Sequence, residues 1–244
     1  MSQNQYDVLA QITEATAAWP VRRHFEEHTF FRALGDITGK TILDVACGTG
    51  LYSRRFKERG AARVVGIDNS EGMVGYARHV EQSAPLGIEY VVQDAAEAHT
   101  LGTFDIVTAT YLLHYAPTKE VLFAMCRNLR ASLAPGALLV SISLNADVEL
   151  TTPSYYHKYD FEIRSSGREG DEVTVISKLA SLPFQLKAFL WSKATYESAL
   201  HEAGLKDLVW HDAAIAPEGI AAHGAEYWDD YVRRPHAVVL SARA

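Results

Sequence analysis

Leu43-Asp44-Val45-Ala46-Cys47-Gly48-Thr49-Gly50 ends a short apolar run and opens a segment of helical character. The run Thr41–Ala46 predicts a buried strand. Gly48 and Gly50 let the backbone bend sharply and approach a ligand without side-chain collision. A strand, a glycine turn and a helix in this order predict the first unit of a doubly wound α/β domain.

The chain around this stretch alternates between apolar runs and longer helical segments. This succession is typical of a mostly parallel sheet with right-handed crossovers and helices on both faces. We expect a seven-stranded sheet. Its predicted strands are Thr41–Ala46, Ala62–Ile67, Ile88–Val92, Phe104–Thr108, Ala137–Ile142, Lys206–Trp210 and His236–Ser241.

The remaining segments are expected to frame the sheet. The N-terminal residues mix aromatic and charged side chains and predict a helical cap with a break at Pro20. Residues 155–165 and 172–179 predict an inserted β-hairpin that covers the open end of the sheet. Lys193–Ala203 predicts a helix, and the stretch around Pro217 predicts a loop.

A chain of 244 residues is long enough for one α/β domain with a buried sheet. We therefore expect a single domain in four parts. These are the helical cap (1–39), the cofactor-binding core (40–145), the inserted substrate-covering segment (146–190) and the C-terminal part of the sheet (191–244).

The composition limits the partners of the chain. A formal net charge of -7 argues against a surface for nucleic-acid phosphates. Cys47 and Cys126 lie in apolar stretches and predict a reduced protein without a disulfide framework. With no visible signal peptide or membrane span, we expect a cytoplasmic monomer or homodimer that acts on a small molecule.

Three acidic residues are expected at the ends of three successive strands. Asp44 ends the first strand and Asp94 the third, while Asp68 ends the second. Because carboxyl ends of parallel strands meet in one crevice, these carboxylates are expected to face one ligand. Asp44 would repel a pyrophosphate, and Ser53 replaces the third glycine of a dinucleotide fingerprint.

The spacing assigns a role to each acid if the ligand is a nucleoside that carries a sulfonium amino acid. Asp44 would face the amino group, Asp68 would accept the ribose hydroxyls, and Asp94 would accept the adenine amino group. Met73 could pack against the face of adenine. Alternatively, each acid only caps the helix after its strand, which fits one acid better than the ordered set.

These residues resemble the class I (Rossmann-like) S-adenosylmethionine-dependent methyltransferase family over residues 40–145. The resemblance implies an enzyme whose cofactor is S-adenosyl-L-methionine. Together with the spacing, it indicates the cofactor-binding residues Asp44, Ala46, Gly48, Gly50, Asp68, Asn69, Met73, Asp94, Ala95 and Thr110.

The segment after the fourth strand, residues 110–115, is expected to face the transferred methyl group. His114 is its candidate general base, or else a histidine that caps the helix near Thr118. The segment lacks the acid or amide and the two prolines that grip an extruded base. The candidate substrate-binding residues are Tyr6, His24, Tyr111, His114, Tyr115, Tyr155 and Trp191, any of which could belong to the core instead.

Tyr6 and Asp7 resemble the Tyr-Asp opening of many small-molecule methyltransferases, in which an N-terminal helix closes over the cofactor. The resemblance makes Tyr6, with His114, a candidate catalytic residue. The alternative is a tyrosine that only packs its helix.

The chain resembles the azapteridine N-methyltransferases of toxoflavin biosynthesis over Pro20–Gly35, Asp44–Gly50, Gly60–Gly66 and Pro85–Tyr90 together. This resemblance implies N-methylation of a flat, nitrogen-rich heteroaromatic molecule in secondary metabolism. A small-molecule O-methyltransferase and a non-catalytic S-adenosylmethionine-binding protein remain open. No acid cluster besides the cofactor acids predicts the magnesium site of catechol-type O-methyltransferases.

Overall fold

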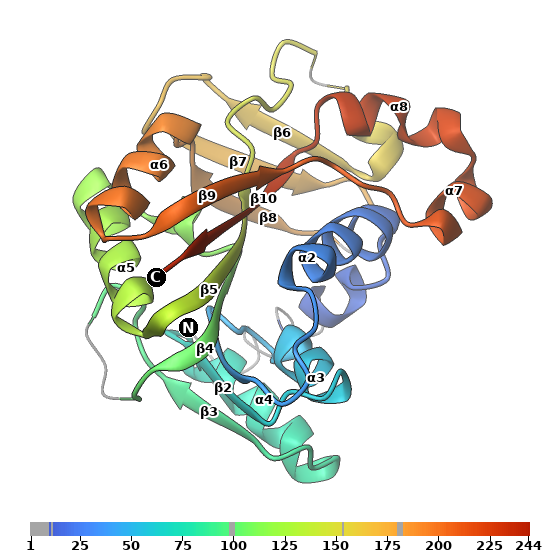
Figure 1. Cartoon of the computed structure of the whole chain (residues 1–244). Coiled ribbons are helices and arrows are strands. Elements are labelled where there is room, and N and C mark those ends of the chain that lie inside the picture. The colour runs from blue at the N-terminus through green and yellow to red at the C-terminus, as the bar shows by residue number, and fades with distance from the viewer. Residues whose placement is uncertain (1–9, 11, 98–100, 153, 180–182) are drawn as a thin grey trace.

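The computed structural model describes residues 10, 12–97, 101–152, 154–179 and 183–244. Within them, seven strands form one sheet in the order β3-β2-β1-β4-β5-β10-β9, and three strands form a second sheet (Figure 1). β10 is antiparallel to both of its neighbours, and the other described pairings of the large sheet are parallel. The predicted α/β fold with a seven-stranded, mostly parallel sheet is confirmed.

The strands of the large sheet agree with the predicted runs, except for the start of β5. β5 begins at Leu133 rather than Ala137, because its pairing with β4 shifts register between Phe104 and Ile106 and accommodates the extra residues. The strands are β1 (Thr41–Val45), β2 (Arg63–Asp68), β3 (Ile88–Val92), β4 (Phe104–Thr110), β5 (Leu133–Leu144), β9 (Lys206–His211) and β10 (Ala237–Arg243).

Helices bury both faces of the sheet. Ile42 and Leu43, successive residues of β1, are fully buried in two different core clusters, as alternation along a strand requires. One face is covered by α2 (Glu27–Leu34), α3 (Leu51–Glu58) and α4 (Glu71–Ser83), the other by α5 (Lys119–Ala131) and α6 (Lys193–Glu202) (Figure 1). No helix in the described part of the chain has the continuous apolar length of a bilayer span.

Residues 12–16 are helical, and a second helix follows after a break next to Pro20. The second helix starts at Pro20, includes a π-helical turn, η1 (Arg22–Glu26), and continues as α2. In this wide turn the N–H of Glu27 donates to the carbonyl of Arg22. Such π-turns are uncommon and are frequent at functional sites.

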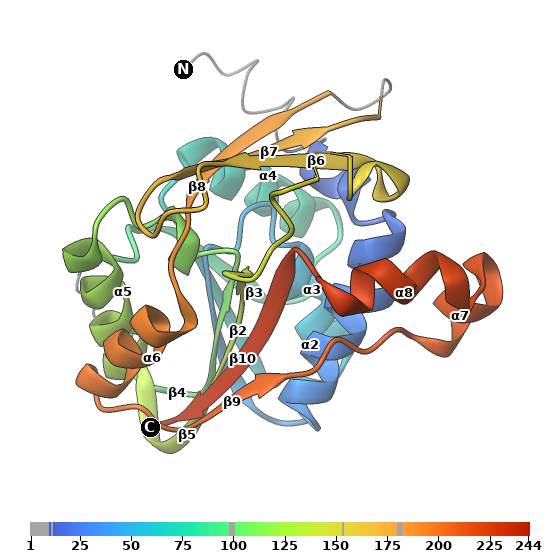
Figure 2. The same cartoon turned by 90° about the horizontal axis from the view of Figure 1, so that it is seen from above.

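The inserted element has three strands rather than the two that were predicted. It consists of η3 (His157–Tyr159), β6 (Phe161–Ser165), β7 (Glu172–Ser177) and β8 (Gln185–Phe189). The three strands pair in order and antiparallel. β8 escapes a pattern-based prediction because most of its residues are exposed and it lacks an apolar run. Figure 2 shows this sheet as a separate layer across one end of the large sheet, and we call it the lid.

The predicted loop around Pro217 is wrong, because this stretch forms α7 (Pro217–His223), followed by α8 (Ala225–Arg233). Pro217 occupies the first turn of α7, where the absence of an N–H costs no intrahelical bond. Trp228 and Tyr231 of α8 are buried against the rest of the domain.

Candidate cofactor and acceptor site

The carboxyl ends of β1 and β4 meet near the centre of the large sheet. The chain continues from β1 to β2 and β3 on one side before it returns to β4 on the other. Ligands of doubly wound sheets bind at such a switch point. Ala46 and Tyr111, which follow these strands, have left-handed φ angles of 61° and 59°. This conformation costs non-glycine residues free energy and clusters at functional sites.

The glycine turn leaves open space where a ligand would approach. Gly48 has a φ of 55°, and a Cβ added there would meet no heavy atom within 4 Å. Gly50 has a φ of 78°, and a Cβ there would collide with the ring of Tyr90. Gly48 therefore lines the open side of the turn, whereas packing against Tyr90 also requires Gly50.

Asp68 holds the glycine turn from the end of β2. One carboxylate oxygen accepts the N–H of Gly48 at 2.9 Å, and the other accepts that of Ser70 at 2.9 Å. Burial raises the pKa of Asp68, and the two hydrogen bonds act against this rise. Because each carboxylate oxygen has two lone pairs, both oxygens can still accept ribose hydroxyls.

Asp44 lies beneath the turn and is 1% exposed. Its two oxygens accept hydrogen bonds from the hydroxyls of Ser53, at 2.6 Å, and Thr108, at 3.0 Å. Burial raises its pKa to about 6 despite these bonds. A buried carboxylate that ionises near neutral pH suits a cationic ligand group such as an ammonium.

The predicted adenine residues come from β3 and α4. Asp94 accepts the N–H of Ala96 at 2.7 Å, and the Asn128 amide donates to the carbonyl of Ala95 at 3.0 Å. These bonds fix the turn after β3. Met73 is half-buried in the first turn of α4, whereas Asn69 is exposed.

Two buried hydroxyls at the crevice lack a hydrogen-bond partner among the described residues. They belong to Thr49, in the glycine turn, and Thr110, at the end of β4. Leaving a buried hydroxyl unpaired costs about 1–3 kcal/mol, which a ligand with polar groups would recover. With the open space at Gly48 and the acids around it, the site fits a nucleoside that carries an amino-acid tail.

His114 lies in the short 3-10 helix η2 (Leu113–Tyr115) and is 4% exposed. Its Nδ1 accepts the N–H of Leu144 at 3.3 Å, so the proton of the neutral ring is on Nε2. Burial lowers its pKa to about 3. His114 does not cap the next helix, because Thr118 is the N-cap of α5. The ring is a neutral hydrogen-bond donor.

Tyr111 and Tyr115 lie with His114 at the crevice. The His114 ring centroid is 5.5 Å from that of Tyr111 and 4.7 Å from that of Tyr115. Tyr115 is 41% exposed and lies within electrostatic range of Asp68. The structure therefore brings together three of the predicted acceptor residues.

The other predicted acceptor residues are placed differently. His24 packs against His223 and Trp228 at the corner of α7 and α8. It lines an open surface cavity of about 470 Å³ there. Tyr6 lies outside the described residues.

Trp191 and Tyr155 use their polar atoms in hydrogen bonds within the fold. The buried Trp191 donates its indole N–H to the carbonyl of Ala116 at 3.0 Å. Tyr155 donates its hydroxyl to the carbonyl of Asp230 at 2.7 Å. Both bonds connect segments distant in the chain, which is a structural role for these side chains.

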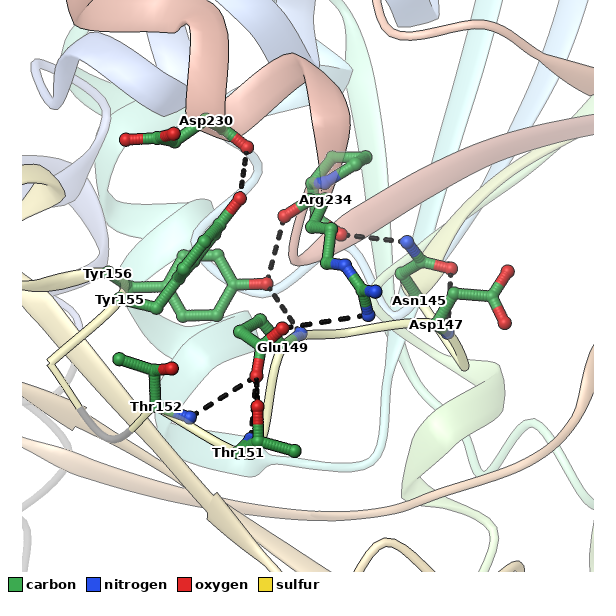
Figure 3. A network of polar contacts seen from close by, with 10 residues as sticks. Asn145, Asp147, Glu149, Thr151, Thr152, Tyr155, Tyr156, Asp230 and Arg234 are labelled. Carbon is green, nitrogen blue, oxygen red and sulfur yellow. Dashed lines mark hydrogen bonds and ion pairs between the residues drawn. The ribbon is translucent and has the colours of Figure 1, made fainter.

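A polar network anchors the lid over the carboxyl end of β5. The Tyr156 hydroxyl accepts the N–H of Glu149 at 3.0 Å and donates to the carbonyl of Arg234 at 2.9 Å (Figure 3). The carboxylate of Glu149 also lies 3.6 Å from the Arg234 guanidinium. In β6, the ring of Phe161 packs on that of His236 at 4.7 Å. The lid is thus fixed above the crevice from one end.

A buried polar cluster next to Tyr111 was not predicted from the sequence. Glu26 is 1% exposed, with one oxygen 3.5 Å from Nε2 of His236 and the other 3.6 Å from Nε of Arg22. The Tyr111 hydroxyl is 3.2 Å from the same His236 nitrogen, and the Tyr231 hydroxyl is 2.6 Å from its Nδ1. The sequence carries only a weak signal for this cluster, because Glu26 and Arg22 lie in a helix rich in aromatic residues and match no motif with a fixed spacing.

The comparison with protein families covers the part of the chain that carries most of this site. Residues 42–136 match the Methyltransferase domain family. The ubiquinone biosynthesis O-methyltransferase of Paraburkholderia xenovorans (strain LB400) is 33% identical over 115 residues, which cover 46% of this chain and 48% of that protein. The chain spans about half the length of the curated relatives it matches.

Solved structures share the fold over most of the chain. An S-adenosylmethionine dependent methyltransferase from Mesorhizobium loti has a TM-score of 0.64 at 22% identity, covering 90% of this chain and 97% of that one. The N-methyltransferase NodS from Bradyrhizobium japonicum WM9, solved with S-adenosyl-l-homocysteine, has a TM-score of 0.57 at 15% identity, with coverages of 94% and 90%.

The chain therefore has the fold of the class I S-adenosylmethionine-dependent methyltransferases, whose cofactor is S-adenosyl-L-methionine. The residues that match the Methyltransferase domain family, 42–136, contain the glycine turn and all three strand-end acids.

Proposed function

We propose that this protein transfers the methyl group of S-adenosyl-L-methionine to a ring nitrogen of a small heteroaromatic molecule, with an azapteridine as the acceptor class. The observation that carries the transfer is the open backbone at Gly48, bordered by Asp68 and two unpaired threonine hydroxyls. The resemblance to azapteridine N-methyltransferases supplies the acceptor class.

Cofactor binding is divided among residues of this chain. Asp68 accepts the ribose hydroxyls, and Asp94 with Ala95 borders the adenine. Asp44 and Thr110 hold the amino-acid end. S-adenosyl-L-methionine, when bound, supplies a methyl group activated by its sulfonium charge.

Methyl transfer is an in-line displacement, for which the protein supplies alignment and exclusion of water. Tyr111 and Tyr115 border the path of the methyl group, and their aromatic faces favour a nearby positive charge. The anchored lid keeps bulk water from the crevice. These contributions suffice for an acceptor atom that already has a free lone pair.

The state of His114 supports nitrogen as the acceptor atom. Its Nδ1 lone pair is occupied by the Leu144 N–H, and burial lowers its pKa to about 3. A group with so low a pKa is a weak general base at neutral pH. A ring nitrogen needs no deprotonation before attack, whereas a phenol does.

The second candidate is O-methylation, which the names of the curated relatives favour. Those relatives match this chain over about half of its length. In the described ranges, no group of three or more His, Cys, Asp or Glu side chains is placed to hold a metal ion. O-methylation would require removal of a proton from the acceptor, a task for which the low pKa of His114 makes it poorly suited.

A methyl-transfer assay over a panel of acceptors tests the proposal. The chain, with tritiated S-adenosylmethionine, is offered azapteridines, pteridines and catechols of matched size, and the product is located by mass spectrometry. We expect N-methylated bicyclic products. Turnover of catechols alone would show that the protein is an O-methyltransferase. Binding of the cofactor without turnover of any acceptor would support a non-catalytic binding protein.

A further inference from the structure

We propose that Glu26 determines acceptor specificity: its Oε2 atom, which forms an ion pair with Arg22 but no hydrogen bond with a described residue, accepts a hydrogen bond from a ring N–H of the acceptor. The acceptor is then a heteroaromatic lactam, in which an N–H lies beside a carbonyl. The inference rests on the proposed methyl transfer and names the group of the acceptor that the site recognises.

The carboxylate of Glu26 is buried, and one of its oxygens lacks a hydrogen bond from the described residues. Glu26 is 1% exposed, and its Oε2 atom has no hydrogen-bond partner among the described residues. Burying a charged group without its hydrogen bonds is among the most costly arrangements in a protein. A donor from a bound molecule would satisfy this oxygen.

Arg22 does not satisfy this oxygen. Its Nε lies 3.6 Å from Oε2, beyond hydrogen-bond distance, and its Nη1 donates to the hydroxyl of Thr16 at 2.8 Å. The guanidinium therefore balances the charge of Glu26 while leaving the lone pairs of Oε2 free. Arg22 is also partly exposed, so it keeps donors for a second ligand atom.

The neighbours of the other oxygen fix the orientation of the carboxylate. Oε1 faces Nε2 of His236 at 3.5 Å, and the Tyr111 hydroxyl lies beside the same nitrogen. The Tyr231 hydroxyl can donate to Nδ1 of His236, and in that tautomer the proton on Nε2 faces the anion. Oε1 thus has donors within the protein, and Oε2 is turned away from them.

The cluster lies at the end of the crevice where the methyl group is expected. Tyr111 directly follows Thr110, the residue assigned to the methionine moiety. Tyr52, in the first turn of α3 after the glycine turn, is within electrostatic range of Glu26 and Arg22. The lid closes the same region, since Phe161 stacks on Trp19 with centroids 6.5 Å apart and packs on His236.

The chemistry of the cluster selects a lactam. A carboxylate oxygen only accepts hydrogen bonds and a guanidinium only donates them. Side by side, Glu26 and Arg22 match a flat molecule whose edge presents an N–H next to a carbonyl oxygen. The surrounding aromatic side chains suit its faces. A phenol or a catechol lacks this paired edge.

Binding of two probes to the protein saturated with S-adenosylhomocysteine tests the proposal. The probes are lumazine (pteridine-2,4-dione) and 1,3-dimethyllumazine, in which both lactam N–H groups are blocked. We expect lumazine to bind about 10- to 100-fold more tightly to the wild type, the range of a hydrogen bond to a charged group. The Glu26→Gln variant should lose this preference.

Glu27→Gln is the matched control, because Glu27 is the next residue and its carboxylate pairs with Arg55 and Arg59 instead. It should keep the preference for lumazine. Unchanged affinity for S-adenosylhomocysteine shows that each variant is folded. If Glu26→Gln does not fold, the wild-type comparison of the two probes still decides.

Equal affinities of the wild type for the two probes, or binding of neither, would overturn the role of Glu26. A preserved preference for lumazine in Glu26→Gln would do the same. Discrimination between the probes without transfer of a methyl group to any acceptor would refute the proposed function and leave the lactam site standing.

Discussion

Nδ1 of His114 accepts the backbone N–H of Leu144, with 3.3 Å between the two nitrogens. Leu144 is the last residue of β5, and its N–H lies where the strand has lost its ladder partner on β4. The imidazole takes over that hydrogen bond and is held as a neutral ring with its proton on Nε2. This hydrogen bond indicates that His114 holds the segment after β4 in place and does not act as a general base.

His114→Ala should therefore lower kcat by less than about tenfold, since a general base would contribute roughly 10²–10⁴. The loss should not vary between pH 6 and 9, because the pKa of His114 is about 3. The variant leaves the Leu144 N–H unpaired and should lose about 1–3 kcal/mol of stability. A pH–rate profile of kcat for the wild type and the variant measures the loss of activity, and urea denaturation measures the loss of stability. A large loss that alkali rescues would restore the general-base role.

Asp68→Asn should weaken binding of S-adenosylhomocysteine by about 10- to 100-fold, because the ribose hydroxyls lose a charged acceptor. The variant keeps an oxygen for the N–H of Gly48 or Ser70. Asp36→Asn is the control, since Asp36 accepts the N–H two residues ahead in the same way but is exposed. Equal affinities of both variants, measured by calorimetry, would mean that Asp68 is structural only.

The Asp44→Asn variant tests whether the buried carboxylate of Asp44 serves cofactor binding rather than the stability of the fold. Burial raises the pKa of Asp44 from 3.8 to about 6 in the folded chain. Its ionisation therefore removes stability as pH rises from about 4 to about 6, by roughly 3 kcal/mol before the hydroxyls reorient. We expect the variant to be no less stable than the wild type at pH 7, with weaker cofactor binding.

If Asp44→Asn unfolds more easily than the wild type at pH 7, the hydrogen bonds of Asp44 with Ser53 and Thr108 outweigh the cost of the buried charge. Urea denaturation at pH 4, 6 and 7 provides the comparison.

Tyr156→Phe should loosen the lid without touching the cofactor. The hydroxyl makes two hydrogen bonds, to Glu149 and Arg234, and loss of such buried contacts costs about 1–3 kcal/mol. We expect the KM for the acceptor to rise while the affinity for S-adenosylhomocysteine stays constant. If hydrogen exchange across β6 becomes faster in the variant while its acceptor kinetics stay unchanged, the lid does not contribute to acceptor binding.

Most of the fold follows from local patterns. The central strands of the large sheet, such as β1 and β2, are buried apolar runs with turn residues between them. Right-handed crossovers restrict the order in which the parallel strands can pair. β8 could not be predicted, since its exposed residues gain stability from pairing with β7 rather than from burial. α7 was missed because Pro217 resembles a loop signal when its position in the helix is unknown.

The cofactor side of the site was easier to predict than the acceptor side. The sequence pattern locates Asp44, Asp68 and Asp94 at the ends of predicted strands. In a parallel sheet these strand ends lie at the same edge. The acceptor side is assembled from distant segments. Glu26 and His236 meet only through the tertiary structure, so no spacing in the sequence relates them. His24, placed by residue type alone, packs instead against α7 and α8.

Calorimetric titration of the chain with S-adenosylhomocysteine, followed by NAD, decides which kind of ligand the glycine turn binds. We expect saturable binding of S-adenosylhomocysteine at one site per chain and no heat from NAD. The Gly48→Leu variant should lose this binding, because its side chain would intrude into the open space at Gly48. Saturable NAD binding without a response to S-adenosylhomocysteine would show that the crevice is a dinucleotide site instead.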